Sequence, residues 1–340
     1  MKKQPLFANP TLPFHHITKI TKPPVKITFK EYVMLDGTKK VLVERVGDGS
    51  IIRRFDKTPF PRKQTDVICP HFLELKWGTG CPYDCSWCYL KGTLRFLPYG
   101  TNPHIKDLDK IKRHTQVFLE YVKESEILNS GELADSLMLE GNKKSFIKFI
   151  VPLFEGQNKH RLLLLTKSDR IQNLLRIDSH RQIIASFSLN ALPVASEWEK
   201  KAPPVENRIN AAKKLYKEGY EVRIRIDPMV LIENWEKFYT DLIDLIFDSF
   251  IPERITLGSL RGLQSTINGV KDTSWVEYLS ESSNWGKKVD INARLAMYKK
   301  LISYLSEKYN YSNVALCKET KALWRILKLD YKKIKCNCVW

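Results

Sequence analysis

The sequence of 340 residues lacks any long uninterrupted apolar stretch, and it lacks the marks of an exported protein. None of its segments approaches the roughly 20 consecutive apolar residues that span a bilayer. Residues 1–24 are basic, aromatic and interrupted by proline, unlike the apolar core of a signal peptide. The cysteines number seven, and an odd count does not suit a secreted disulfide framework. We therefore expect a cytoplasmic protein without a membrane segment.

Acidic residues are scarce relative to basic ones. There are 38 Asp and Glu against 56 Lys and Arg, which gives a formal net charge of +18. An excess of this size attracts polyanions and speeds their encounter with the protein. Basic and aromatic residues alternate at Lys91, Arg95 and Phe96, and again from Trp324 to Lys333, which suits phosphate contact combined with base stacking. The charge favours a nucleic-acid partner, although a merely soluble, lysine-rich surface is the simpler explanation, and charge does not separate DNA from RNA.

Three cysteines stand together in the run Gly-Thr-Gly-Cys81-Pro-Tyr-Asp-Cys85-Ser-Trp-Cys88. Three thiolates in one short loop are able to hold three corners of a cubane 4Fe–4S cluster and to leave the fourth iron open. An open iron chelates the amino and carboxylate groups of S-adenosylmethionine, whose reductive cleavage gives a 5′-deoxyadenosyl radical. The CxxxCxxC spacing, with Trp87 in the aromatic position before the last cysteine, resembles the signature of the radical S-adenosylmethionine superfamily.

Other cysteine sites have different spacings. Structural zinc usually takes two CxxC-type pairs, and no second pair with that spacing lies nearby. Bacterial ferredoxins separate their first three cysteines by two residues each time and place a fourth before proline, whereas the first gap here is three residues. Zinc and a chance grouping are the alternatives to an iron–sulfur cluster.

Strands and helices alternate from Phe72 onward, which predicts an α/β fold with a parallel sheet. The six expected strands are residues 72–77, 126–130, 161–166, 182–189, 221–226 and 254–257. The helices between them are expected near residues 105–124, 142–155, 168–178, 205–219 and 233–250. Six strands are fewer than the eight of a closed barrel, so we predict an open, partial (βα)6 barrel of the radical S-adenosylmethionine type.

Two regions flank this barrel, which we place at residues 71–270. Residues 1–70 are predicted to form an N-terminal extension with short strands at 26–32, 39–46 and 50–55. Residues 271–340 are helical in pattern, with helices expected at 291–309 and 320–328, and are predicted to form a C-terminal appendage.

In parallel β/α folds the active site forms at the carboxyl ends of the strands, and the cysteine loop directly follows the first strand. Glu132 follows the second strand after a glycine, and its carboxylate would accept hydrogen bonds from the methionyl ammonium. A glutamate at the start of a helix, favoured there by the helix dipole, is the alternative for this residue. Lys167 follows the third strand and is expected to face the cavity, beside residues that would simply cap the next helix.

Polar side chains also alternate along the fourth and fifth strands. Ser186, Ser188 and Asn190 share one face of the fourth strand, where they suit hydrogen bonds to a ribose or a carboxylate. The fifth strand carries Arg223 and Arg225. Arg225 lies nearer the strand end, so we assign it to the methionyl carboxylate.

The order of CPYDCSWCYLKGT, LLLLTKSDRI, SFSLNA and Asp227-Pro228-Met229 resembles the spore photoproduct lyase family of the radical superfamily, over residues 70–265. The resemblance implies a partial β/α barrel with one 4Fe–4S cluster, held by the three motif cysteines. It places Lys167, Ser188 and Asn190 near S-adenosylmethionine. The enzymes that give the family its name reverse a thymine dimer in DNA by hydrogen abstraction, so the resemblance favours DNA over RNA as the partner. An electron donor such as flavodoxin or ferredoxin is also expected.

One departure from the family pattern follows the second strand. The family's lyases carry a cysteine there that returns a hydrogen atom to the product radical, whereas residues 129–135 of this sequence contain no thiol, and Glu132 occupies that place. Another donor is then needed, and Cys338 or Tyr89 is the candidate. We therefore expect the protein to repair spore photoproduct poorly or not at all.

The other cysteines and the substrate are left open by the sequence. Cys336 and Cys338 would supply a mobile thiol or ligate a second metal with Cys317 or Cys69, although Cys69 also reads as an inert buried thiol. A radical enzyme acting on nucleic acid is the first functional hypothesis. The alternatives are a radical enzyme that modifies a peptide or small metabolite, and a non-catalytic nucleic-acid-binding protein with a structural cluster.

Overall fold

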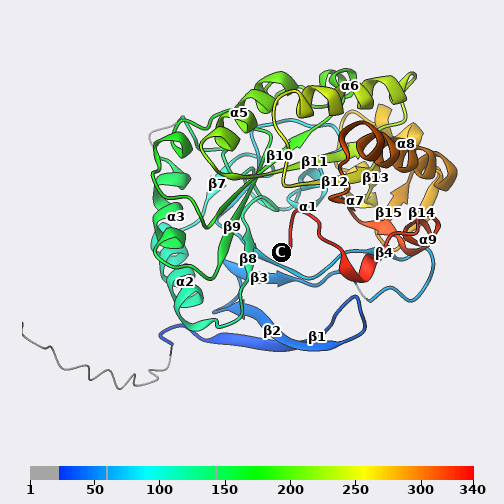
Figure 1. Cartoon of the computed structure of the whole chain (residues 1–340). Coiled ribbons are helices and arrows are strands. Elements are labelled where there is room, and N and C mark those ends of the chain that lie inside the picture. Colours follow the sequence, from blue (N-terminus) through cyan, green and yellow to red (C-terminus); the bar gives the residue numbers. More distant parts are fainter. Residues whose placement is uncertain (1–22, 59, 142–143) are drawn as a thin grey trace, which may run out of the picture.

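A computed structural model describes residues 23–58, 60–141 and 144–340. The N-terminal residues 1–22, considered above for a signal peptide, lie outside the described residues. The main feature is one ten-stranded sheet with the order β1-β2-β3-β5-β8-β9-β10-β11-β12-β16. Figure 1 shows its strands curved around a central space, with helices packed outside them and residues of the C-terminal end inside.

The N-terminal strands form an antiparallel meander on one side of this sheet. They are β1 (Ile27–Val33), β2 (Lys39–Val46) and β3 (Ile52–Phe55), close to their predicted positions. Gly37 and Gly47 make the turns with φ of 87° and 61°, which residues with a side chain rarely adopt. Strand β3 pairs antiparallel with β5 (Phe72–Leu75), so the meander continues the main sheet across residue 70.

Seven parallel strands complete the sheet, and all six predicted strands are among them. These are β5, β8 (Ile127–Asn129), β9 (Arg161–Thr166), β10 (Ile183–Leu189), β11 (Glu221–Met229) and β12 (Arg254–Ser259). The seventh, β16 (Val314–Leu316), pairs in parallel with β12. This strand was not among those predicted, because the sequence after residue 270 was assigned to a helical region. The α/β fold with a largely parallel sheet is confirmed.

Four helices cover the parallel strands where the sequence predicted them: α2 (Leu108–Tyr121), α3 (Phe146–Glu155), α5 (Val205–Lys217) and α6 (Trp235–Phe247). Their apolar faces pack on the sheet in one continuous core. The prediction of a helix over 168–178 is wrong, because only η1 (Leu174–Arg176) forms there. The Ser168 hydroxyl accepts a hydrogen bond from the backbone N–H of Arg170, a local turn that competes with helix formation. A short helix α4 (Leu192–Trp198) was not predicted.

The region after residue 270 is not wholly helical, in contrast to the prediction. It contains the predicted α8 (Ile291–Tyr309) and α9 (Lys321–Ile326), but also β14 (Glu281–Ser283), β15 (Gly286–Lys288), β16 and β17 (Glu319–Thr320). Strand β17 pairs with β4 (Val67–Ile68), far away in the sequence. The division of the chain at residues 70 and 270 stays a prediction.

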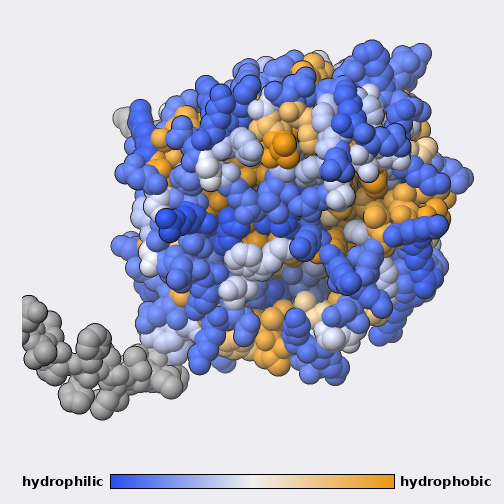
Figure 2. All heavy atoms as spheres, in the orientation of Figure 1, coloured by the Kyte–Doolittle hydropathy of each residue, from blue (hydrophilic) through white to orange (hydrophobic). Residues whose placement is uncertain are grey.

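The remaining elements are short. They are β6 (Gly78–Thr79), α1 (Leu90–Thr93), β7 (His104–Ile105), β13 (Arg261–Gly262), α7 (Gln264–Ile267), η2 (Ser274–Tyr278) and η3 (Tyr331–Lys333). None of the helices in the described part of the chain combines the length and the apolar character needed to cross a bilayer. Hydrophilic side chains cover most of the face seen in Figure 2, with separate apolar patches between them.

Candidate functional site

A cavity of about 380 Å³ lies at the carboxyl ends of the parallel strands. All seven cysteines of the chain line it, together with Trp87, Tyr89, Glu132, Lys167, Ser188 and Arg225. Most residues singled out in the sequence are therefore brought together, because the carboxyl ends of parallel strands share one edge of the sheet.

The cysteine motif is held by backbone contacts at its start and by a ring contact within it. Gly80, immediately before it, has φ +85°, and a side chain there would meet the carbonyl oxygen of Asn102 at 2.3 Å, so only glycine fits. The N–H of Cys81 donates to the carbonyl of Thr101 at 2.9 Å. The ring of Trp87 packs against Trp198, with ring centroids 5.5 Å apart. The motif is thus a preformed loop on the cavity wall.

Three sulfur donors on one wall suit a 4Fe–4S cluster. Cys85 is buried and Cys81 and Cys88 are half-buried. Burial raises the pKa of the Cys85 thiol to about 12, so binding of a metal must displace its proton. Within the described residues, no three or more His, Cys, Asp or Glu side chains converge as ligands of a single metal ion. A cubane does not need such convergence, because each cysteine binds a different iron.

Glu132 lies on the cavity wall in the loop after β8. Gly131 allows that loop to approach the next strand, since a Cβ there would lie 2.5 Å from the Cβ of Leu165. The side-chain amide of Asn129 donates to Glu132 Oε1 at 2.9 Å and orients the carboxylate. The hydroxyl of Tyr89, in the cysteine loop, donates to the main-chain carbonyl of Glu132. Desolvation and then the charge of Glu132 raise the pKa of Tyr89 well above its usual value, so this phenol keeps its proton.

Lys167 and Ser188 also line the cavity, at the ends of the neighbouring strands β9 and β10. The ammonium of Lys167 donates to the Ser188 hydroxyl at 2.9 Å and lies 3.4 Å from Glu199 Oε1. Burial opposes the charge of Lys167, yet Glu199 holds its pKa above the usual value. Glu199 also accepts a hydrogen bond from Arg208 at 2.6 Å. Lys167 is therefore a positioned cation with protons still free to donate into the cavity.

Sequence reasoning assigned no role to Asp135, which also lines the cavity. Its carboxylate accepts hydrogen bonds from the Thr166 hydroxyl at 2.7 Å and from the backbone N–H groups of Lys167 and Leu137. Asp135 thus ties the loop after β8 to the end of β9. An aspartate six residues after Asn129 gives no sequence signal of this role, because its partners belong to another strand.

Arg225 lines the cavity, but its guanidinium already has partners. It donates to Cys317 Sγ at 3.1 Å and lies 3.5 Å from Asp227 Oδ2. Asp227 is held in turn by two hydrogen bonds from Arg261, at 2.8 and 2.9 Å. Although burial opposes its charge, the two arginines keep the pKa of Asp227 far below the usual range. The assignment of Arg225 to the methionyl carboxylate stays a prediction.

Three predicted polar positions do not reach the cavity. Among the described residues that line it, Asn190, Ser186 and Arg223 are missing. The Asn190 side chain is fully buried, donates to the carbonyl of Pro228 at 2.8 Å and accepts from Tyr239, so its contact with the cofactor stays a prediction. Ser186 and Arg223 contact the segment 336–340 instead.

Cys338 is 5% exposed, which excludes the mobile thiol expected from its position in the sequence. Its sulfur accepts a hydrogen bond from the Asn129 side chain at 3.7 Å, so it lies beside the loop that lacks the family's cysteine. Trp324 is also buried, at 3% exposure, and is not available to stack on a base as the sequence suggested.

A family model described as spore photoproduct lyase matches residues 73–259. The chain belongs to the spore photoproduct lyase family. It is 26% identical over 175 residues to the spore photoproduct lyase of Clostridium acetobutylicum and 25% identical over 194 residues to that of Bacillus subtilis. These matches cover 50% and 53% of this chain, and the chain spans about half the length of these curated relatives.

Solved structures of spore photoproduct lyases share the fold. One of them, complexed with dinucleoside spore photoproduct, has a TM-score of 0.61 at 17% identity, over 75% of this chain and 80% of that chain. A double mutant with bound AdoMet and dinucleoside spore photoproduct has a TM-score of 0.60 at 18% identity, with the same coverage. The predicted family and the α/β fold are thereby confirmed.

Proposed function

We propose that this member of the spore photoproduct lyase family is a radical S-adenosylmethionine enzyme that acts on a lesion in DNA. The observation that carries the proposal is the preformed CxxxCxxC loop, which opens onto the same cavity as Glu132, Lys167 and Ser188. Membership of the family and the bound molecules named for the related structures support it.

In this proposal Cys81, Cys85 and Cys88 hold a 4Fe–4S cluster, and Glu132 binds the methionyl ammonium. When bound, the cluster supplies the electron that cleaves S-adenosylmethionine to methionine and a 5′-deoxyadenosyl radical. Trp87 closes the wall behind the motif, and Lys167 and Ser188 bind polar groups of the cofactor. Asn129 orients Glu132 through its hydrogen bond of 2.9 Å.

The substrate radical must then receive a hydrogen atom. Tyr89 and Cys338 are the proposed donors, and both line the cavity next to the loop 129–135, where the family's cysteine is missing. Because the donor differs, we propose that the natural lesion differs from spore photoproduct. A damaged base must leave the stack to reach this cavity, and the net charge of +18 favours binding of the phosphates around it.

Anaerobic reconstitution tests this function. Reduced protein is expected to convert S-adenosylmethionine to 5′-deoxyadenosine, and ultraviolet-damaged DNA is expected to increase that yield over undamaged DNA of the same sequence. Incubations with RNA and with peptide pools are run in parallel. If only peptide stimulates cleavage of S-adenosylmethionine, the protein is a radical enzyme that modifies peptides. Absence of any cleavage would refute the radical chemistry.

A further inference from the structure

Four cysteines that the proposed function does not require as cluster ligands gather on the cavity wall. They are Cys69, Cys317, Cys336 and Cys338, and all are free thiols. They come from three distant parts of the chain: the connection between β4 and β5, the end of β16, and the segment after η3. All the cysteines outside the motif thus line one cavity, and this gathering requires a structural explanation.

Strand pairing brings Cys69 close to Cys317, and a backbone hydrogen bond fixes the position of Cys317. In the antiparallel pair of β4 and β17, Ile68 lies opposite Glu319, so the next step of the register brings Cys69 to Lys318, the neighbour of Cys317. The backbone N–H of Cys317 donates to the carbonyl of Leu257 at 2.7 Å, which fixes it at the end of the parallel sheet.

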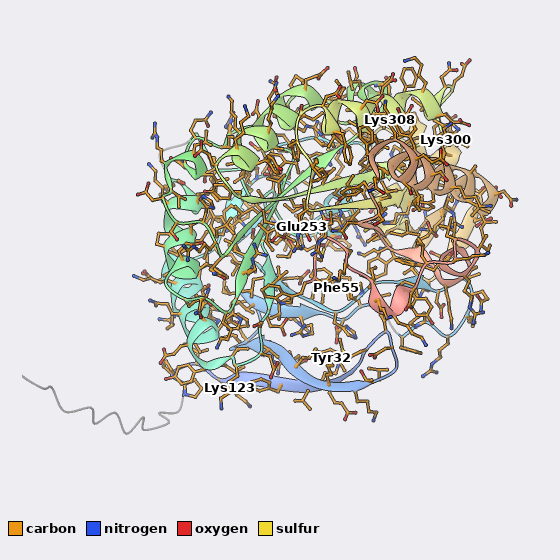
Figure 3. The ribbon with its side chains drawn as sticks, viewed as in Figure 1. Tyr32, Phe55, Lys123, Glu253, Lys300 and Lys308 are labelled. Carbon is orange, nitrogen blue, oxygen red and sulfur yellow. The ribbon has the colours of Figure 1, made fainter. Side chains whose placement is uncertain are left out.

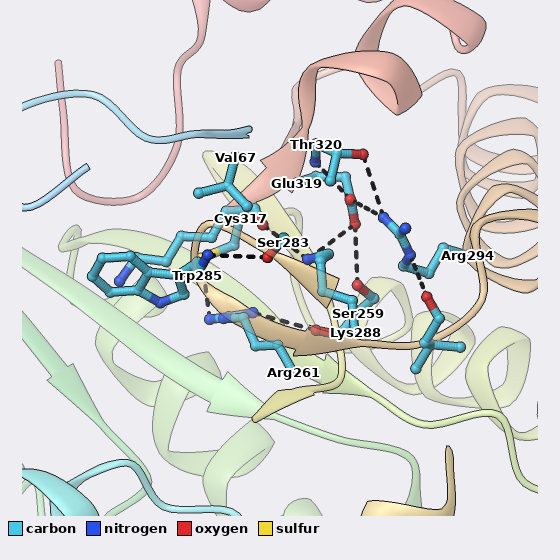
Figure 4. Close-up of polar contacts among 12 residues, drawn as sticks. Val67, Ser259, Arg261, Ser283, Trp285, Lys288, Arg294, Cys317, Glu319 and Thr320 are labelled. Atoms are coloured by element: carbon cyan, nitrogen blue, oxygen red, sulfur yellow. Dashed lines mark hydrogen bonds and ion pairs between the residues drawn. The ribbon is translucent and has the colours of Figure 1, made fainter. Parts of the chain in front are cut away.

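Buried ions hold the Cys317 turn from behind. Glu319 accepts hydrogen bonds from Arg294 and from Ser259, and lies 3.6 Å from the ammonium of Lys288 (Figure 4). These side chains are fully buried, so the turn that presents Cys317 is rigid.

The other two thiols belong to the C-terminal segment, which lies inside the curve of the sheet (Figure 1). Arg223 donates to the carbonyl of Asn337 at 2.7 Å, and Arg254 donates to the carbonyl of Cys336 at 3.2 Å. The side chain of Asn337 points into the strands, while Cys336 and Cys338 on either side of it line the cavity. Cys336 and Cys338 pack with Cys69 and with Phe55, which lies near the same segment in Figure 3.

The sulfurs are surrounded by N–H donors and cations. Arg225 and Arg261 donate to Cys317 Sγ at 3.1 and 3.6 Å, and Asn129 donates to Cys338 Sγ at 3.7 Å. Lys318 is held over the ring of Trp285, 4.1 Å from its centroid. An iron–sulfur cluster with four cysteinate ligands is anionic. Hydrogen bonds to its sulfurs and nearby positive charges stabilise it.

We propose that Cys69, Cys317, Cys336 and Cys338 bind a second iron–sulfur cluster, in which every iron of a cubane has a protein ligand. A single zinc ion does not fit as well, because no three such side chains among the described residues converge on one ion, while cluster ligands bind separate irons. With no open iron, this cluster does not bind S-adenosylmethionine. Ligation also removes Cys338 as a hydrogen donor, which leaves Tyr89.

Metal analysis of two variants tests the proposal. After anaerobic reconstitution with iron and sulfide, the parent is expected to hold about eight irons, the sum of two cubanes. The variant C81A/C85A/C88A is expected to keep about four irons, with an electron paramagnetic resonance signal that S-adenosylmethionine does not change. The variant C336S/C338S is expected to keep about four irons whose signal S-adenosylmethionine does change.

Lys335→Ala, a change of the exposed residue just before this segment, is the matched control and should keep the iron content of the parent. If C336S/C338S does not fold, C69S replaces it, because this change leaves the segment 336–340 intact. Loss of all iron from C81A/C85A/C88A, or stoichiometric zinc in its place, would overturn the second cluster. Loss of all iron from C336S/C338S, with none lost from C81A/C85A/C88A, would instead contradict the cluster site of the proposed function.

Discussion

At the scale of single residues, the Glu132 carboxylate is the group that we propose to bind the methionyl ammonium of the cofactor. Asn129 and the backbone around Gly131 fix Glu132 on the cavity wall. Glu132 is the one acidic residue that the sequence analysis assigned to the methionyl ammonium. A charge-assisted hydrogen bond to an ammonium contributes about 1.5–3 kcal/mol.

Glu132→Gln is therefore expected to raise the Kd of S-adenosylmethionine at least about tenfold, since about 1.4 kcal/mol corresponds to one decade. Isothermal titration calorimetry on the reconstituted protein measures this Kd, and the iron content of the variant should equal that of the parent. Glu124→Gln changes an exposed glutamate in the connection before β8; it is the control and should bind like the parent. Equal affinities for both variants would show that Glu132 does not contact the methionyl group.

Tyr89 is the residue on which hydrogen return is expected to depend. Its raised pKa keeps the phenol protonated at neutral pH and above, so its O–H is available. Tyr89→Phe is expected to leave cleavage of S-adenosylmethionine intact but to lower product formed per 5′-deoxyadenosine. Product analysis in deuterated solvent measures this, with Tyr99→Phe, an exposed tyrosine of the next loop, as control. Unchanged deuterium incorporation and yield in Tyr89→Phe would exclude it as the donor.

At the scale of elements, the segment 336–340 acts as part of the barrel interior. Asn337 alone bridges three strands, through Ser186 at 2.7 Å, the carbonyl of Ile224 at 3.1 Å and Thr256 at 2.6 Å. Arg223 of β11 donates to the carbonyls of Asn337 and Val339, and Arg254 of β12 donates to those of Cys336 and Val339.

Asn337→Ala is expected to lower the free energy of unfolding by about 2–3 kcal/mol, because Ser186 and Thr256 would be left buried without this partner. Urea unfolding of the apoprotein measures the change. Lys335→Ala, exposed and two residues away, should change stability little. A loss for Asn337→Ala no larger than that of the control would mean that water replaces the missing amide.

The same segment explains which parts of the site the sequence could predict. Apolar runs located the six predicted strands of the parallel sheet, and the cavity residues after them follow from the rule that parallel strands end at one edge of the sheet. The alternation of side chains along a strand correctly placed Ser186 and Ser188 on one face of β10. It does not tell how far along the strand the cavity extends. Ser188, level with Arg225, reaches the cavity, whereas Ser186, level with Arg223, meets Asn337. The gathering of Cys69, Cys317 and Cys336 depends on contacts between distant segments, which no local pattern encodes.

At the scale of the whole molecule, positive charge is expected to govern encounter with DNA. Near the cysteine loop, Phe96 is 82% exposed and Arg95 lies over its ring at 4.2 Å, so a cation and a stacking surface stand together. On another part of the molecule, Lys300 of α8 is paired with Glu236 at 3.2 Å (Figure 3).

Affinity for damaged DNA is expected to fall at least about tenfold between about 50 and 200 mM salt, because bound cations release counterions. The double variant R95A/F96A should bind more weakly than the parent at each salt concentration, while Lys300→Ala should bind like it. Fluorescence anisotropy with a labelled duplex measures both. A salt-independent affinity would show that the surface charge is incidental and would favour a peptide or metabolite substrate.

The contact between Asn129 and Cys338 joins residues 209 positions apart, and it lies at the centre of the site. Contacts of such long range form late in folding, because closing a large loop costs chain entropy before any contact repays it. Until then the thiols of the cavity face solvent and any oxidant in it. Refolding under air is therefore expected to trap mispaired cysteines, and a reducing environment is needed during folding as well as during catalysis.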